Sequence, residues 1–380
     1  VANGVNGVVL SWADAGADAD VVYRRAYTAG VAGEWEKIAE ITDPTYVDTK
    51  VVGDVKYGYA VAGKSGENEG AMCAEVTVIY LPATTVETSN TPGGIKLVWK
   101  AVANADPNLK YFVYRAEFKD GEWAEKRLIT LTTAGYTDLT AANGVLYRYR
   151  IAVVHGSQQS YAVEGTQQMR LTLPALSADN QATGVQLTWK KNAAAEVYEI
   201  YRSVYTNNTW TPWGKPIHTV EADTLTWTDT TAVNGEKYRY TVRVRNGEDI
   251  SGYKDSAALI RLDRVNVTSM VNNTSNITIT WETNTAAAKY AVYRSVLVDG
   301  AWSSWTRITY IQKPNTSYVD YDVTNGVTYR YRITAMKDVY QSSARVSDNI
   351  LRIGNTNITA AAYTGRMQLT IKANALATSY

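Results

Sequence analysis

The sequence contains little of the chemistry on which most enzymes and metal sites depend. Its 380 residues include one cysteine, Cys73, and two histidines, His155 and His218. A single cysteine excludes an internal disulfide and any zinc site with several cysteine ligands. Neither histidine recurs along the chain or has a nucleophile close to it in the sequence. We therefore expect a protein that is not an enzyme and that needs no cofactor.

The chain also lacks a strong excess of charge and a long apolar segment. Its 38 Lys and Arg against 37 Asp and Glu give a net charge of +1, so nothing marks the whole chain for nucleic acid. No apolar run approaches the roughly 20 residues of a membrane span, and we expect no membrane insertion. The charges are unevenly distributed, with 6 basic and 12 acidic side chains in residues 1–80 and 10 and 7 in residues 263–353. This gradient leaves head-to-tail self-association open.

Tyrosine and tryptophan are abundant, at 28 and 11 residues against 2 phenylalanines, and many of them recur at regular intervals. Alternating apolar runs end four times in tryptophan, at Trp12, Trp99, Trp189 and Trp281. A Tyr-Arg pair follows each tryptophan 11 to 15 residues later, at 23–24, 114–115, 201–202 and 293–294. A further tyrosine follows each tryptophan after 45 to 49 residues, at Tyr57, Tyr147, Tyr238 and Tyr329. Three landmarks in four copies indicate an internal repeat.

Each copy has the period of a β-strand. In VQLTW, Val185, Leu187 and Trp189 fall on one face, while Gln186 and Thr188 fall on the other. Such alternation is typical of a half-buried antiparallel strand, and no segment carries a convincing helical stripe. Asn-Gly turns at 143–144, 234–235 and 325–326 separate strands. Six or seven short strands in about 90 residues predict a β-sandwich.

Three motifs carry a resemblance to a known family: the tryptophan that ends the second strand, the Tyr-Arg of the third, and Asn-Gly-x-x-Tyr before the sixth. The chain resembles tandem fibronectin type III domains of bacterial surface and secreted proteins. The resemblance implies an all-β array of seven-stranded immunoglobulin-like sandwiches, and the lack of paired cysteines favours it over antibody-type domains. It implies that the four tryptophans are core residues. It also implies that the tyrosines at Tyr57, Tyr147, Tyr238 and Tyr329 form tyrosine corners, in which the hydroxyl bonds back to the preceding loop.

The pattern predicts the domain boundaries. We expect domains at 1–80, where most of the first strand is missing, and at 81–172, 173–262 and 263–353, followed by the opening strands of a fifth, truncated copy at 354–380. Because the last strand of each copy runs almost directly into the next copy, the linkers are only a few residues long.

Two groups of residues are candidate sites. Tryptophans follow the Tyr-Arg strand in every copy, as pairs in the last two: Trp210, Trp213, Trp302 and Trp305. Indole rings anchor many binding sites, so these residues either bind a ligand or pack over the sheet. Asp14, Asp18 and Asp20 lie in one loop and are a weak calcium candidate, because they lack the rest of a known calcium-binding loop. The recurring Asp48, Asp138, Asp229 and Asp320 are interpreted as turn caps.

The sequence thus predicts a non-catalytic extracellular or cell-surface rod that acts as a spacer or adhesion scaffold. Its partner would be an unknown protein or a glycan on a surface. One alternative is a carbohydrate-binding accessory array, in which the paired tryptophans contact glycan. A second alternative is a subunit of an extracellular filament.

Overall fold

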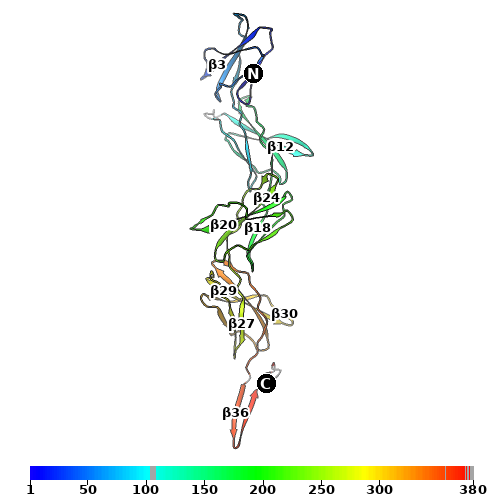
Figure 1. The fold of residues 1–380 in the computed structure, drawn as a ribbon, viewed down its shortest axis with the longest axis vertical. Helices are drawn as coiled ribbons and strands as arrows, with labels where there is room; N and C mark the ends of the chain where they lie inside the picture. Colours follow the sequence, from blue (N-terminus) through cyan, green and yellow to red (C-terminus); the bar gives the residue numbers. More distant parts are fainter. Residues whose placement is uncertain (103–107, 356, 373, 375, 377–380) are drawn as a thin grey trace. The chain divides into compact units, whose positions relative to one another are not determined.

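All regular elements of the described chain are β-strands. The computed structural model describes residues 1–102, 108–355, 357–372, 374 and 376, and Figure 1 shows strands joined by turns and loops. The expected all-β fold class is confirmed. The chain divides into two compact units, one formed by Val1–Leu173, Asn192–Glu196 and Val244–Tyr253, the other by Pro174–Lys191, Val197–Arg243 and Lys254–Tyr380.

The first pair of sheets contains strands β1 to β9. One sheet has the order β1 (Ala2–Asn3), β2 (Val8–Ser11), β6 (Thr45–Asp48). The other has the order β4 (Val31–Ala32), β3 (Ala19–Thr28), β7 (Lys56–Ser65), β8 (Asn68–Glu69), with β5 (Glu36–Ile41) on β3 and β9 (Val76–Ile79) on β7. The opening strand β1 has only two residues.

The second pair repeats this topology. One sheet joins β10 (Glu87–Asn90), β11 (Ile95–Val98) and β14 (Tyr136–Asp138). The other joins β13 (Glu122–Leu131), β12 (Lys110–Lys119), β15 (Leu146–His155) and β16 (Gln158–Gln159), with β17 (Gln168–Met169) on β15.

The third and fourth pairs follow the same scheme. The third has β18 (Leu176–Asn180), β19 (Val185–Trp189) and β23 (Thr226–Asp229) in one sheet. Its second sheet has β21 (Thr209–Trp210), β20 (Val197–Thr206), β24 (Lys237–Asn246) and β25 (Asp249–Ile250), with β22 (His218–Glu221) on β20 and β26 (Leu259–Ile260) on β24.

The first sheet of the fourth pair has β27 (Val267–Asn272), β28 (Ile277–Trp281) and β32 (Ser317–Asp320). Its second sheet has β30 (Ala301–Trp302), β29 (Lys289–Val298), β33 (Thr328–Lys337) and β34 (Tyr340–Gln341), with β31 (Thr306–Gln312) on β29 and β35 (Ile350–Leu351) on β33.

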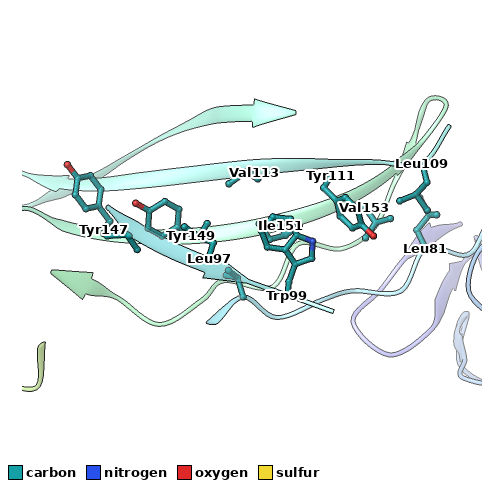
Figure 2. Close-up of a cluster of buried hydrophobic side chains, with 12 residues drawn as sticks. Leu81, Leu97, Trp99, Leu109, Tyr111, Val113, Tyr147, Tyr149, Ile151 and Val153 are labelled. Carbon is teal, nitrogen blue, oxygen red and sulfur yellow. The ribbon is translucent and has the colours of Figure 1, made fainter. Parts of the chain in front are cut away.

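The side chains that alternate inward from the two sheets form the core of each sandwich. In the second sandwich, Leu97 and Trp99 face Tyr111, Val113 and Ile151, which come from the other sheet (Figure 2). The rings of Trp99 and Tyr111 meet edge to face, with their centroids 5.7 Å apart. Such interdigitation of two apolar faces is the main stabilising element of a sandwich.

Every described ladder among β1 to β35 connects strands within one of the ranges 1–80, 81–172, 173–262 and 263–353. We propose these ranges as the folding domains. The remaining strands β36 (Asn357–Tyr363) and β37 (Arg366–Lys372) form a hairpin, where the opening strands of a fifth copy are expected. Residues 356, 373, 375 and 377–380 of that expected copy lie outside the described residues.

Candidate functional site

The Tyr-Arg landmark places a buried ion pair inside each sandwich. The arginine points to the core side of its strand, where its Nη1 donates to a buried aspartate. The distances are 3.0 Å for Arg24–Asp48, 2.9 Å for Arg115–Asp138, 2.8 Å for Arg202–Asp229 and 3.0 Å for Arg294–Asp320. The aspartates are at most 1 % exposed. A charge at that depth requires a partner, so the arginine is structural.

Each of these aspartates accepts further hydrogen bonds. Asp138 receives the backbone N–H of Thr140 at 2.9 Å, which is the expected turn cap, and the hydroxyl of Tyr149 at 2.8 Å. Burial opposes ionisation of Asp138, but the hydrogen bonds from Thr140 and Arg115 outweigh it and lower the pKa of the carboxyl. Burial, together with the adjacent negative charge of Asp138, raises the pKa of Tyr149.

The four expected corner tyrosines make one recurring hydrogen bond. Each hydroxyl accepts the backbone N–H of the residue five positions earlier. The distances are 2.9 Å for Val52–Tyr57, 2.9 Å for Ala142–Tyr147, 2.9 Å for Val233–Tyr238 and 2.8 Å for Thr324–Tyr329. This bond ties the turn to the strand that follows it.

The expected core tryptophans do not all have the same surroundings. Trp99, Trp189 and Trp281 are 6 %, 3 % and 3 % exposed, whereas Trp12 is only half-buried. The Nε1 of Trp12 donates to Asp20 at 2.7 Å, which gives its indole N–H a partner at the edge of the first sandwich.

The aspartates of the calcium candidate act separately. Asp14 accepts the N–H of Gly16 at 2.7 Å, Asp18 accepts the N–H of Gly66 at 3.1 Å, and Asp20 accepts the Trp12 indole N–H. In the described part of the chain, no three His, Cys, Asp or Glu side chains are grouped to hold a metal ion. Each carboxylate therefore has a local structural contact that explains its presence.

The outer face of the larger sheet carries aromatic rings stacked with arginines. In the third sandwich the Arg239 guanidinium lies between Trp210 and Trp213, with distances of 4.7 and 4.9 Å to the ring centroids. In the fourth, Arg330 lies over Trp302 at 4.2 Å and over Trp305 at 4.9 Å. We call these outer rows the arginine–aromatic ladders; such contacts contribute about 0.5–1 kcal/mol each at exposed sites.

The ladders change the interpretation of the paired tryptophans. All four, Trp210, Trp213, Trp302 and Trp305, are half-buried. Each of these indoles has at least one face in contact with a guanidinium group. A sugar that stacked on those faces would first have to displace an arginine. The packing alternative therefore has a direct physical basis, and the role of these indoles in ligand binding stays a prediction.

Within the first unit, neighbouring sandwiches meet through a pair of asparagines. Asn143, from an Asn-Gly turn, donates from Nδ2 to Asn192 Oδ1 at 2.9 Å and receives the Asn192 amide in return at 3.1 Å. Asn192 also donates to the Thr172 carbonyl at 2.8 Å. Gly144 follows Asn143 with a φ of 79°, and a Cβ there would approach Ala194 to 3.2 Å. This close approach favours glycine.

Within the second unit the same arrangement recurs. Asn234 and Asn284 exchange amide hydrogen bonds at 3.2 and 3.3 Å, and Asn284 donates to the Asp263 carbonyl at 2.8 Å. We call each reciprocal pair an asparagine clasp. Among the described residues, the junction between the first two sandwiches has no such clasp. Its position three residues after the landmark tryptophan is Val102, where the next copy has Asn192. There, His155 Nδ1 lies 2.9 Å from Asp54 Oδ1.

A second contact accompanies the first at each of these junctions. Asn3 donates to the carbonyl of Gln159 at 3.2 Å, and Asn90 does the same to Ile250 at 3.2 Å, both in the first unit. In the second unit, Asn180 donates to Gln341 at 3.1 Å. Each of these junctions thus has a second contact besides the first.

Sequence reasoning missed the ion pairs and the clasps, whereas packing of the tryptophans over the sheet was one of its two alternatives. A signal for each was present. The aspartates and arginines recur in all four copies, and asparagine recurs three residues after the landmark tryptophan at Asn192 and Asn284 and three residues after Ile371 at Asn374. When two polar residues recur together at the same positions of successive copies, a contact between them is the simplest explanation.

No protein-family model matches the chain. Among solved structures, it is similar to the FN1–FN3 domains of chicken CNTN1, with 12 % identity over 71 % of this chain and 98 % of that one and a TM-score of 0.25. It is also similar to a segment of two fibronectin type III domains of chicken tenascin, with 17 % identity over 47 % and 99 % and a TM-score of 0.25. These values are too low to support any inference about function. The repeated strand order supports a tandem fibronectin type III-like fold.

No helix with the length and apolar character of a membrane span occurs in the described part of the chain.

Proposed function

We propose that the chain is a non-catalytic scaffold that works as a spacer, and that it belongs to an extracellular or cell-surface protein, as the resemblance to bacterial surface proteins implies. The observation that carries the spacer role is the recurrence of paired junction contacts. The asparagine clasp and the second asparagine contact occur together in the first unit and again in the second unit.

Repeated junctions suit a spacer for a physical reason. Hydrogen bonds contribute about 0.5–1.5 kcal/mol each when both partners would otherwise bind water. Four or five such bonds at one junction limit the angles that two domains explore. A short linker adds to this restriction, because its few residues cannot separate the domains. A spacer of this kind transmits a fixed distance, and this role requires no cavity or catalytic group.

The spacer role predicts a narrow distribution of distances across a junction. In the full chain, with Cys73→Ser and spin labels at Glu221→Cys and Thr306→Cys, pulsed electron spin resonance measures the distance between the third and fourth sandwiches. Both labelling positions are exposed. We expect one narrow distance peak, which broadens when Asn234→Ala removes one side of the clasp.

The matched control is Asn143→Ala, the same substitution in the corresponding turn of the second sandwich. It breaks a different clasp, so the labelled distance should keep its width. A broad distribution before any clasp is removed would contradict the spacer proposal. Equal broadening by Asn234→Ala and Asn143→Ala would contradict the role assigned to the clasp.

A further inference from the structure

The fourth sandwich has an outer face with four basic side chains and no ion pair. Lys289 and Arg307 lie over the Tyr310 ring at 4.3 and 4.4 Å. Arg330 and Arg332 flank Trp305 at 4.9 and 4.8 Å. In the described residues none of these four cations has a carboxylate within salt-bridge distance. We call this surface, on β31, β29 and β33, the basic ladder face.

The positions of Arg330 and Arg332 are neutralised in the second sandwich. Arg148 stacks on Trp123 at 4.2 Å and pairs with Glu164 at 3.2 Å. Arg150 stacks on Tyr114 at 4.5 Å and pairs with Glu125 at 2.5 Å. The ladder itself therefore accepts carboxylates.

The third and first sandwiches follow the second. Arg239 of the third ladder pairs with Asp255. Arg25 of the first, which lies over Trp35 at 4.5 Å, pairs with Glu75. An arginine stacked on a ring thus has a carboxylate partner in three of the four ladders.

Backbone pairing shows what replaces the carboxylates in the fourth sandwich. Glu164 forms an antiparallel bridge with Arg150, and Val346 forms the same bridge with Arg332. Val346 therefore occupies the place of Glu164, with 43 % of its surface exposed.

The second replacement is a tryptophan. In the strand register, Lys126 lies opposite Arg115 and Thr306 lies opposite the equivalent Arg294. The residue before Lys126 is Glu125 and the residue before Thr306 is Trp305, so Trp305 takes the place of Glu125. Both carboxylates of the second ladder thus have uncharged counterparts here, and the cations that they would neutralise remain.

The geometry favours carboxylates in a row over a single small anion. Arg330 and Arg332 are two residues apart on β33, so they are spaced by about 6.6 Å along the strand. Two rings contact the Arg332 guanidinium, since Tyr293 lies at 4.8 Å and Trp305 at 4.8 Å. Stacking covers the faces of a guanidinium and leaves N–H groups at its edge for carboxylate oxygens. The Nε of Arg330 donates to Ser295 Oγ at 3.4 Å, so its two Nη groups are the ones left for a ligand. Lys289 and Arg307 extend the charge across two neighbouring strands.

We propose that the basic ladder face binds an acidic polysaccharide whose sugar units carry carboxylates, a polyuronate. A polymer with one carboxylate per sugar presents its charges at regular spacing, and it is stiff enough to lose little conformational entropy on an open sheet face. This ligand site does not depend on the spacer role, because it uses the outer face of one sandwich and no junction residue.

Other acidic occupants fit less well. The acidic region of a second copy, residues 1–80, already uses Glu36, Glu40 and Glu75 in ion pairs with its own Arg24, Lys37, Lys64 and Arg25. A flexible acidic peptide would lose more conformational entropy on binding. Proteins bind single-stranded nucleic acid through aromatic rings that are free to stack on its bases. Here guanidinium groups contact the rings of Trp302 and Trp305.

The test restores the missing carboxylate. Affinity electrophoresis of the full chain in gels that contain polygalacturonate gives a dissociation constant from the retardation. Val346→Asp supplies the group that Asp255 supplies in the third sandwich, and we expect it to weaken binding about tenfold. Val346→Thr, a β-branched neutral substitution at the same exposed site, should bind as the parent does. Asp255→Val should create a second site and raise the number of polymer segments bound per chain.

Several results would overturn the proposal. These are no retardation of the parent chain, equal retardation of Val346→Asp and the parent, or equal retardation by fully methyl-esterified polygalacturonate, which has no charge. Equal affinity for poly-glutamate or single-stranded DNA would show that charge alone is recognised, and would overturn the assignment to a polysaccharide. Sedimentation of the parent as a dimer that Val346→Asp dissociates would assign the face to self-association instead.

Discussion

Substitution of one buried aspartate should destabilise one sandwich in a measurable way. Asp138 is fully buried and accepts four hydrogen bonds, from Arg115 Nη1 at 2.9 Å, the Thr140 N–H at 2.9 Å, the Thr140 hydroxyl at 2.7 Å and Tyr149 at 2.8 Å. Asp138→Asn keeps the shape of the side chain and removes its charge. Arg115, only 6 % exposed, then loses its buried counter-charge.

Breaking a buried ion pair by changing one partner costs about 3–5 kcal/mol. The lower end applies here, because Arg115 keeps a hydrogen bond to Thr140 at 2.8 Å and has Glu117 at 3.9 Å. We therefore expect the free energy of unfolding of the second sandwich to fall by about 3 kcal/mol.

Hydrogen exchange read by mass spectrometry measures this loss where it occurs. In the full chain, peptides from β12 and β15 should exchange faster in Asp138→Asn, while peptides from the fourth sandwich should not change. Asp120→Asn is the matched control, since Asp120 lies exposed in a turn with a φ of 52° that asparagine adopts readily. A loss below about 1 kcal/mol would refute a structural role for the ion pair.

Three further predictions concern the other recurring contacts. Tyr238→Phe removes the acceptor of the corner hydrogen bond and the donor of a hydrogen bond to Glu236 at 2.6 Å. It should lower the free energy of unfolding by about 2 kcal/mol in urea titrations. The pKa values of Asp138 and Asp229 lie below their ordinary range, because hydrogen bonds and arginine outweigh burial. The stability that these two carboxylates add should therefore be complete above roughly pH 4 and decline as the pH falls through their folded pKa values, as urea titrations across that range would show. Trp210→Ala with Trp213→Ala should lower the melting temperature without changing retention on neutral polysaccharides, because the guanidinium between them covers the indole faces; a stable double variant that loses retention would instead support a glycan platform.

The sequence was sufficient to predict the repeat and its strands, because both depend on the inward-facing residues. Period-two alternation and the landmark tryptophans recur wherever the core needs the same shape. The all-β class follows from that alternation alone. The buried positions of Trp99, Trp189 and Trp281 illustrate this, and the partial exposure of Trp12 shows where a single copy departs from the pattern.

The contacts between polar residues could not be predicted in the same way. Arg202 and Asp229 are 27 residues apart and belong to different sheets. Their pairing depends on how the two sheets face one another, which periodicity does not specify. The ladders pose a similar difficulty. The arginine that contacts Trp213 lies on a strand that follows 26 residues later. Only cross-strand register brings the two side chains together.

The four copies share similar inward-facing residues but differ in the residues on the outer face of the larger sheet. Inward positions are restricted by packing, and any change there costs about 1–5 kcal/mol. Outward ladder positions have no such restriction. Glu164, Asp255 and Val346 therefore occupy equivalent exposed sites. The residue after each of them donates its backbone N–H to the carbonyl of the equivalent tyrosine, at Tyr149, Tyr240 and Tyr331. A carboxylate there neutralises one arginine of its ladder, and an apolar residue leaves that arginine without a carboxylate. The array can thus alter the charge of one sandwich face by a single substitution, while the cores and the junction contacts that would set the spacing remain the same.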